Sequence, residues 1–259
     1  MKKFWDDLWK REEEFLARGK RDLRHGVSSV GVSTLAGQFY CEYKVENEFA
    51  LGEIPTEAKE EGTLLHDELI PMEPISKAGF VKLVSQRKPS YAVLKVWGEL
   101  GDIRLIGEPD HIIWSEERPL WLVELKTTAG DPNSLWDDQL SQILIYGALL
   151  DKMGFDCSKL RLALVRMRAK ELSDEQKRAW IVTISKYLEQ GRAKELEHEN
   201  LGAMKVHLID HDVHAAELGV RKMQGYWLEE REATSSTSVG KCRACEYNSV
   251  CSKTLYKPN

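Results

Sequence analysis

The sequence predicts a mixed α/β fold, in which strands and one central helix form the body and further helices lie toward both ends. Short runs rich in β-branched and aromatic residues fill much of the chain between residues 91 and 126. Apolar residues recur every three to four positions in residues 2–20. With 42% hydrophobic and 31% charged residues, the composition is typical of a soluble globular protein. This order of elements favours a sheet flanked by helices.

The N-terminal part of the chain is predicted to be helical. Residues 2–20 are amphipathic, which predicts a helix that docks on the body; a helix that binds a partner is the alternative. Residues 26–31 are rich in Ser and Gly and predict a loop, followed by a helix that carries Cys41. A second helix is expected over residues 56–69 and holds His66, with prolines just beyond its end.

The rest of the chain is predicted to supply the sheet and the C-terminal helices. Strands are expected at residues 91–100, 103–107, 110–114, 120–126, 160–167 and 179–185. Helices are expected at residues 132–152, 186–199 and 212–233, and a flexible link at residues 234–240. Gly101 and Asp102 predict a hairpin turn between the first two strands. The helix over residues 132–152 should be largely buried, because apolar residues surround its second half.

Charge and hydropathy limit the classes of function. The formal net charge of -5 gives no support to bulk attraction for nucleic acid, but a DNA enzyme whose site gathers carboxylates remains compatible with it. No apolar run reaches transmembrane length, so no membrane association is expected. Residues 1–15 carry acids throughout and no continuous apolar region, which is unlike a secretory signal or a transit peptide. A cytoplasmic protein is therefore expected.

Two acids and a lysine lie on neighbouring predicted strands. Asp110 begins one strand, and Glu124 and Lys126 share one face of the next because their spacing is two residues. Two such carboxylates suit a hard cation such as Mg²⁺ or Mn²⁺, and the lysine can orient water and offset phosphate charge. By itself this pattern is common, and a polar strand face with a Glu–Lys pair is the alternative. The apolar flanks favour a site, since charges among them are costly unless paired or metal-bound.

Two helical segments add polar candidates to this pattern. His66 is a third candidate metal ligand, although a lone histidine is more often a surface or core residue. On the central helix, Gln139, Gln142 and Tyr146 share one face, with mostly apolar residues around them. Buried polar side chains need partners, and the acids of the strands are one source. Capping of the core is an equal alternative.

The cysteines form the second constellation. Five cysteines in a chain expected in the cytoplasm argue against a disulfide framework. Cys242, Cys245 and Cys251 form a C-x2-C-x5-C cluster, and Cys41 is the candidate fourth ligand; Cys157 is expected to be a buried free thiol. Four cysteines suit either zinc or an iron–sulfur cluster, and the partition into three close and one remote favours a cluster.

Taken together, these motifs resemble a known family. Cys41, a G-x-x-x-H helix, a G-x-x-D strand, E-x-K, Q-x-x-x-Y and the terminal cysteines follow one another in the order of the iron–sulfur nucleases of the RecB-type PD-(D/E)xK superfamily. The chain is most similar to the Cas-four (CRISPR-associated) exonucleases, and the AddB nuclease domain and eukaryotic single-strand exonucleases are related. The resemblance covers residues 33 to 251.

The resemblance implies a fold and a domain organisation. The expected fold is a restriction-endonuclease-like PD-(D/E)xK core, a mixed central sheet flanked by helices, with an iron–sulfur domain formed by N- and C-terminal segments. Residues 1–30 would be an N-terminal amphipathic extension, residues 31–70 with 205–259 the helical cluster region, and residues 71–204 the nuclease core.

The resemblance also implies roles for individual residues. His66, Asp110 and Glu124 would hold Mn²⁺ or Mg²⁺ together with the backbone carbonyl of Leu125. Lys126, Gln142 and Tyr146 would complete the catalytic group. The implied cluster, usually [4Fe–4S] and sometimes [2Fe–2S], would be held by four ligands: Cys41, Cys242, Cys245 and Cys251. Gly62 and Gly107 are the glycines of the G-x-x-x-H and G-x-x-D motifs.

The implied activity is hydrolysis of phosphodiester bonds in DNA, preferably single-stranded and often from the 5′ end. CRISPR spacer acquisition, with integration proteins as partners, and DNA repair are the implied settings. A non-catalytic module that binds DNA ends or a partner is the alternative. Five basic residues are candidate DNA contacts, with plain solvation as the alternative: Arg87, Lys88, Lys95, Arg166 and Arg168. Trp97 and Trp136 are candidates for base stacking, but core packing is favoured for both.

Two features depart from the family. Glu42 follows Cys41 where the family commonly has proline, and the amphipathic N-terminal segment is longer than in the CRISPR-linked members. Both departures favour a stand-alone member with a role in repair or in a mobile element. The sequence predicts no oligomeric state.

Overall fold

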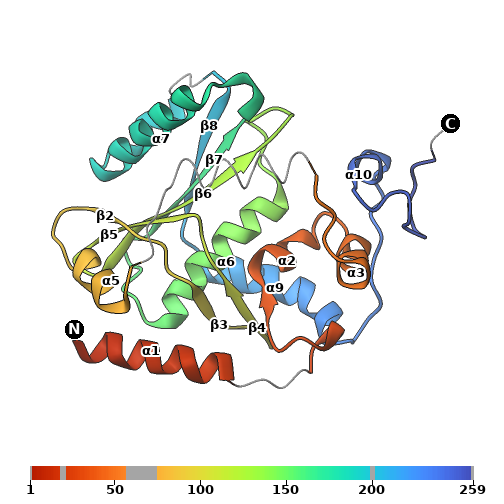
Figure 1. Ribbon diagram of the computed structural model, residues 1–259, viewed down its shortest axis with the longest axis horizontal. Helices are drawn as coiled ribbons and strands as arrows, with labels where there is room; N and C mark the ends of the chain where they lie inside the picture. Colours follow the sequence, from red (N-terminus) through yellow and green to blue (C-terminus); the bar gives the residue numbers. More distant parts are fainter. Residues whose placement is uncertain (1, 18–21, 57–74, 199–201, 258–259) are drawn as a thin grey trace.

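The structure, a computed structural model, describes residues 2–17, 22–56, 75–198 and 202–257. Two sheets form its centre, one of five strands in the order β2-β5-β6-β7-β8 and one of three strands in the order β1-β4-β3 (Figure 1). Helices lie on both sides of the larger sheet (Figure 1). Within the described residues, no helix combines the length and hydrophobicity that crossing a bilayer requires. The predicted mixed α/β fold is confirmed.

The larger sheet is mixed. Its strands are β2 (Ser90–Tyr91), β5 (His111–Ser115), β6 (Arg118–Thr127), β7 (Arg161–Met167) and β8 (Met204–Asp210). β6 and β7 pair in parallel, and the other neighbours pair antiparallel. A parallel pair needs a long crossover, and helix α6 (Asp137–Met153) provides it.

The smaller sheet lies beside α6. It consists of β1 (Val30–Gly31), β3 (Val96–Leu100) and β4 (Ile103–Gly107). β3 and β4 form an antiparallel hairpin, in which Gly101 takes the positive φ of +59° that the turn requires. β1 pairs in parallel with β4 and leads directly into α2 (Val32–Gly37).

The remaining helices surround these sheets. They are α1 (Lys2–Ala17), α3 (Glu42–Leu51), α5 (Lys77–Val84), α7 (Asp174–Glu189), α8 (Ala193–His198), α9 (Val213–Trp227) and α10 (Val239–Ala244). Two short 3₁₀ turns, Arg24–Gly26 and Ala169–Glu171, connect elements.

Alternation along the strands divides the core into two clusters. Leu122 and Leu164 point to the face of the sheet that α6 covers. Buried residues of α1, α2 and α9 belong to the same cluster. Val123 and Val165 point to the opposite face, where Ile184 of α7 packs. Residues 124 and 126 therefore face α6, by the same alternation.

Most strand predictions agree with the structure, and one is wrong. The strand predicted over residues 103–107 is β4, whereas residues 91–100 divide between β2 and β3. Residues 179–185 are not a strand but the middle of α7. A capping box between Ser173 and Gln176 starts this helix, and its apolar residues meet the sheet at helical spacing.

Three further differences concern helices and the last strand. β8 and α5 were not predicted from the sequence, and the helix expected to carry Cys41 ends at Gly37. Cys41 instead occupies the N-cap of α3. The helix expected over residues 56–69, including its end, lies outside the described residues.

The predicted amphipathic helix α1 docks on the body. Trp5, Leu8 and Phe15 are buried in the main core, while Leu16 is exposed. The indole Nε1 of Trp5 also donates a hydrogen bond of 3.0 Å to Glu117 Oε2. The segment is therefore part of the folded core.

The docking of α1 predicts that leucine-to-alanine substitutions on its buried and exposed faces change the free energy of unfolding by different amounts. Leu8→Ala removes a fully buried side chain and should lower the free energy of unfolding by about 2–5 kcal/mol. Leu16 is 52% exposed, so Leu16→Ala should change it by no more than about 0.5 kcal/mol. Chemical denaturation of both variants measures the difference; equal effects would contradict a docked helix.

Candidate active site

Asp110 and Glu124 lie side by side on neighbouring strands. Asp110 precedes β5, and its Oδ2 accepts a hydrogen bond of 2.7 Å from the backbone N–H of Leu125 in β6. Its own N–H lies 3.4 Å from Glu124 Oε2. The antiparallel pairing of His111 with Val123 sets this arrangement. The strand pairing predicted from the sequence thus brings the two acids together.

Lys126 completes an ion pair with the buried acid. Its Nζ lies 2.9 Å from Oε1 of Glu124, which is only 1% exposed. Burial, followed by the charge of Asp110, raises the pKa of Glu124 above that of an ordinary glutamate, against the opposing effect of Lys126. Burial also works against the charge of Lys126, but Glu124 and Asp110 outweigh it and raise the pKa of Lys126. The lysine therefore stays protonated.

Helix α6 supplies the polar partners that the buried glutamate needs. Gln142 Nε2 donates a hydrogen bond of 2.8 Å to Glu124 Oε1 and lies 3.3 Å from the hydroxyl of Tyr146. Burial, with the charge of Glu124 adding to it, raises the pKa of Tyr146. The phenol therefore remains neutral. Gln142 therefore contacts the carboxylate of Glu124 directly and does not merely cap the core.

Gly107 is required by close packing rather than by its backbone angles. A Cβ atom at this position would lie 2.7 Å from Cε1 of Tyr146 and 3.1 Å from Cβ of Val32. The ring of Tyr146 therefore rests against the bare backbone at the end of β4. The glycine lets α6 approach the smaller sheet closely enough to carry Gln142 to Glu124.

Arg166 has protein partners beneath the loop that follows β6. Its side chain is fully buried in β7, where it pairs in register with Lys126. Its guanidinium donates to Thr128 Oγ1 at 3.1 Å and to the carbonyl of Asp131 at 3.3 Å. It also lies 4.7 Å from the ring centre of Trp136, which is 47% exposed. Arg166 thus supports this loop, and the core packing favoured for Trp136 is not observed.

The other basic candidates are dispersed. The side chain of Arg87 lies 3.5 Å from Glu116, and the hydroxyl of Ser115 donates a hydrogen bond to the backbone carbonyl of Arg87. These contacts place Arg87 at the far end of β5 from Asp110. Lys88 and Lys95 are exposed, and Arg168 pairs with Glu171 at 3.2 Å. Trp97 is buried in the core. Contact of these basic residues with DNA stays a prediction.

His66 and Gly62 lie outside the described residues, so their part in the site stays a prediction. The donor set that the described residues present is two adjacent carboxylates, one of them buried. Adjacent carboxylates repel each other unless a cation or proton is shared between them, and Mg²⁺ and Mn²⁺ prefer such oxygen ligands. Asp110 and Glu124 therefore fit a divalent metal.

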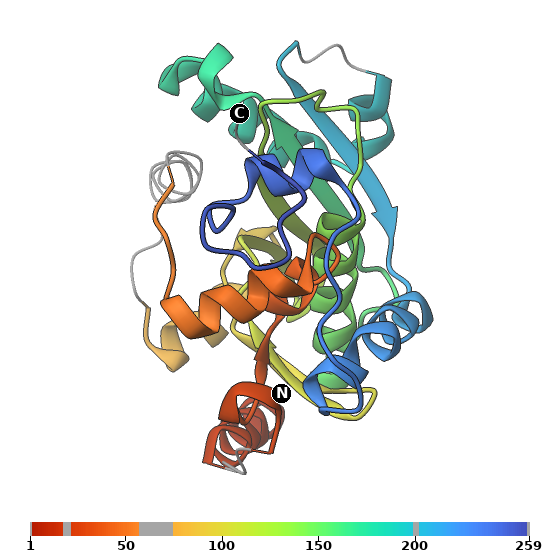
Figure 2. The same cartoon turned by 90° about the vertical axis from the view of Figure 1, so that its right-hand side faces the viewer.

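The four predicted cluster cysteines line one cavity. Cys41, Cys242, Cys245 and Cys251 all border it, although the first lies some two hundred residues before the others. Figure 2 shows the C-terminal segment lying beside α3. The N–H of Ser236 lies 3.3 Å from Sγ of Cys41, and Tyr40 donates a hydrogen bond to the carbonyl of Lys241 at 2.6 Å. Cys157 is buried elsewhere in the core.

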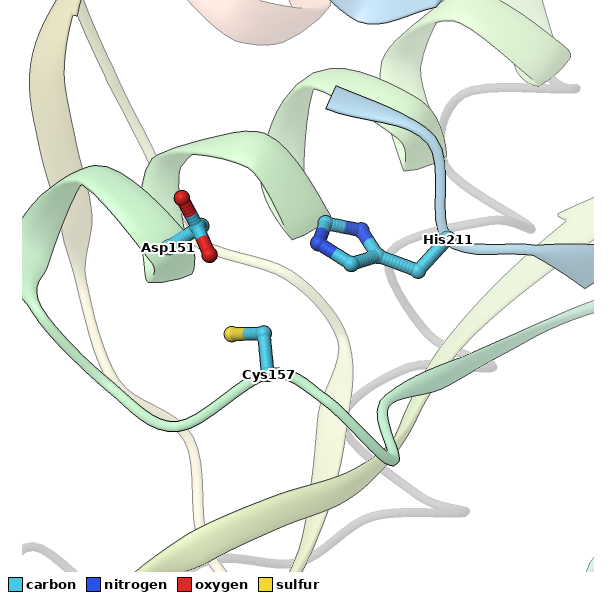
Figure 3. Close-up of side chains that lie close together, drawn as sticks. All are labelled: Asp151, Cys157 and His211. Carbon is cyan, nitrogen blue, oxygen red and sulfur yellow. The ribbon is translucent and has the colours of Figure 1, made fainter. Parts of the chain in front are cut away.

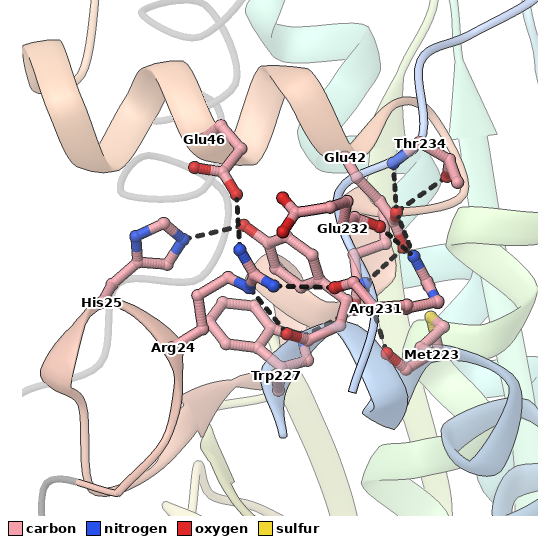
Figure 4. A network of polar contacts seen from close by, with 11 residues as sticks. Arg24, His25, Glu42, Glu46, Met223, Trp227, Arg231, Glu232 and Thr234 are labelled. Atoms are coloured by element: carbon pink, nitrogen blue, oxygen red, sulfur yellow. Dashed lines mark hydrogen bonds and ion pairs between the residues drawn. The ribbon is translucent and has the colours of Figure 1, made fainter. Parts of the chain in front are cut away.

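Glu42, which follows Cys41 where the family commonly has proline, links the N-terminal part of the chain to the C-terminal part through hydrogen bonds (Figure 4). Its buried carboxylate accepts hydrogen bonds from Arg231 at 2.6 Å and from the N–H of Thr234 at 2.7 Å. Burial favours the neutral acid, but these bonds hold the pKa of Glu42 below its usual range. Nearby, Arg24 donates to the carbonyls of Tyr226 and Arg231, both at 2.7 Å. No sequence pattern indicated these pairings.

The close packing at Gly107 predicts that alanine substitution there destabilises the fold, whereas alanine at a loosely surrounded glycine does not. Gly107→Ala should lower the free energy of unfolding by about 1–3 kcal/mol, because Tyr146 and Val32 must move. No atom of the described part of the chain lies within 4 Å of a Cβ added at Gly219 in α9, so Gly219→Ala should be neutral or stabilising by up to about 1 kcal/mol. Thermal or chemical unfolding tests both; an equally tolerated Gly107→Ala would contradict the close packing.

Comparison with known proteins assigns a family. The model of the PD-(D/E)XK nuclease superfamily matches residues 27–252. Curated proteins give no match. Among solved structures, one match is the crystal structure of SSO0001, at 15% identity over 99% of this chain and 98% of that one, with a TM-score of 0.49. On the family match and the site geometry, the chain belongs to the PD-(D/E)XK nuclease superfamily.

Proposed function

We propose that this protein is a metal-dependent deoxyribonuclease that degrades single-stranded DNA from an end, from 5′ to 3′. The observation that carries the proposal is the buried Glu124 carboxylate, held between Lys126 at 2.9 Å and Gln142 at 2.8 Å and adjacent to Asp110. Two adjacent acids beside a protonated lysine suit a divalent cation and a phosphodiester. Membership of the nuclease superfamily supports the same chemistry.

Each residue would have a distinct task in this reaction. Asp110 and Glu124, with His66 and the Leu125 carbonyl as further candidates, would hold Mg²⁺ or Mn²⁺, which lowers the pKa of bound water and offsets phosphate charge. Lys126 would place a permanent positive charge beside the scissile phosphate. Gln142 would hold Glu124 in its orientation.

We propose further that the four-cysteine cavity holds an iron–sulfur cluster. Three close thiols and one remote thiol border one space, and an N–H lies beside the sulfur of Cys41. Hydrogen bonds to the sulfurs are among the factors that tune such clusters. Zinc is the alternative occupant. In either case the centre would join the α3 segment to the C-terminal segment and so stabilise the fold.

The biological setting is proposed on the resemblance of the motifs. The proposed settings are CRISPR spacer acquisition, with integration proteins as partners, and DNA repair. Glu42 in place of the family's proline, together with the longer N-terminal segment, supports a stand-alone member with a role in repair or in a mobile element. A module that binds DNA ends without cutting them is the competing function.

The proposed activity predicts a metal-dependent nuclease assay. With Mn²⁺ and single-stranded DNA labelled at either end, the wild type should release short products from the 5′ end first. Glu124→Ala removes a proposed metal ligand, and Lys126→Ala removes the positive charge beside the phosphate, so each should lower the rate by at least about 100-fold. Lys82→Ala, an exposed lysine on α5, is the matched control and should keep full activity.

Two results would count against this proposal. Cleavage that persists unchanged in Glu124→Ala and Lys126→Ala would refute the site. A folded wild type that binds DNA ends but cuts none, with either metal, would favour the non-catalytic module instead.

The cluster proposal predicts iron in the purified protein. Anaerobically purified wild type should be brown and contain about four iron atoms per chain if the cluster is [4Fe–4S]. Cys242→Ser should lose the colour and the iron, whereas Cys157→Ala should keep both, since Cys157 lies outside the cavity. A colourless wild type with zinc in the four-cysteine cavity would contradict the iron assignment.

A further inference from the structure

Three side chains of metal-binding type meet at the end of α6 that is remote from the nuclease site (Figure 3). Asp151 lies in the last turn of α6, Cys157 in the connection from α6 to β7, and His211 directly after β8. Their ligand atoms all lie within 4.8 Å of one another, and no other such trio occurs among the residues that the structure describes. None of the three belongs to the nuclease site or the four-cysteine cavity.

His211 gives independent evidence of a missing ligand. Both of its ring nitrogens are buried, and neither has a hydrogen-bond partner among the residues that the structure describes. The ring is pressed onto α6: a Cβ at Gly147 would lie 2.9 Å from its Nδ1. A buried polar atom without a partner costs free energy, so native proteins rarely keep one without a ligand or ion to satisfy it. Here two such atoms belong to one imidazole that faces a thiol and a carboxylate.

We propose that Asp151, Cys157 and His211 bind one zinc ion, which ties the end of α6 to the connections around β7 and β8. A thiolate and an imidazole select zinc over Mg²⁺ and Mn²⁺, which prefer all-oxygen sites. Three protein ligands leave the fourth tetrahedral position to water, which the exposure of Asp151 allows.

The protonation of the ligands is compatible with this assignment. Burial lowers the pKa of His211, so its imidazole is neutral and has a lone pair for the metal. Burial, with Asp151 and Asp156 adding to it, raises the pKa of Cys157 to about 12. Zinc must therefore displace the thiol proton to solvent when it binds, as it does in other thiolate sites.

The proposed zinc site lies on α6, the helix that also carries Gln142 to Glu124. Asp151 follows Gln142 on the same helix by nine residues, or about 13 Å along its axis. His211 contacts Gly147 between them. Zinc at the end of α6 would hold both the helix and the exit of β8 without touching the catalytic acids.

Zinc content and thermal shift measure this site in the whole protein, with its four-cysteine centre intact. After equilibration with Zn²⁺ and desalting, the wild type should retain one zinc more per chain than Asp151→Asn, Cys157→Ala or His211→Asn. Zn²⁺ should raise the melting temperature of the wild type and of none of these variants. His214→Asn, which changes an exposed histidine at the start of α9, is the matched control and should behave as the wild type.

The comparison separates this site from the four cysteines, because zinc bound there would be the same in every variant. Substitution by Co²⁺ adds a direct test of the thiolate: the sulfur-to-cobalt charge-transfer absorption should fall in Cys157→Ala. Equal zinc content and equal thermal shifts in wild type, Asp151→Asn and His211→Asn would overturn the proposal. Asp151 is exposed, so its substitution should not disturb folding.

Discussion

The buried carboxylate of Glu124 is the constraint on which the site depends. A nearly inaccessible acid beside a second acid is unstable unless something offsets its charge and satisfies its oxygens. Lys126 offsets part of the charge, and Gln142 satisfies one oxygen. The crossover helix must therefore pass close to the sheet, which the bare backbone at Gly107 permits. The negative charge that remains is what a divalent cation would neutralise.

A second buried acid organises the ends of the chain. Glu42 holds Arg231 and Thr234, and through them the segment that leads to the last three cysteines. Cys41 precedes Glu42 directly, so the same contacts bring all four cysteines to one cavity. Loop closure over so many residues costs entropy, which a bound centre or a buried ion pair can offset. In both constellations a buried carboxylate fixes the relative positions of the candidate metal ligands.

The parts of the site that the sequence predicts are those with local geometry. Glu124 and Lys126 share a strand face by a spacing of two, and Gln142 and Tyr146 share a helix face by a spacing of four. By contrast, Glu42 meets Arg231 across 189 positions, and His211 meets Cys157 through tertiary folding alone. The middle of α7, residues 179–185, was mistaken for a strand because its β-branched residues follow strand propensity, while its capping box and its packing on the sheet decide for helix. The capping box is a local signal that was missed, whereas the packing on the sheet is tertiary and lies outside local propensity.

Binding of Mn²⁺ to the protein tests the central claim most directly, because it does not depend on turnover or on the choice of DNA. Titration followed by the paramagnetic signal of free Mn²⁺ should reveal a site in the wild type. The site should survive in Lys126→Ala, which leaves both acids in place, and disappear in Asp110→Asn and Glu124→Gln. Undiminished Mn²⁺ binding in the two acid variants would contradict the account.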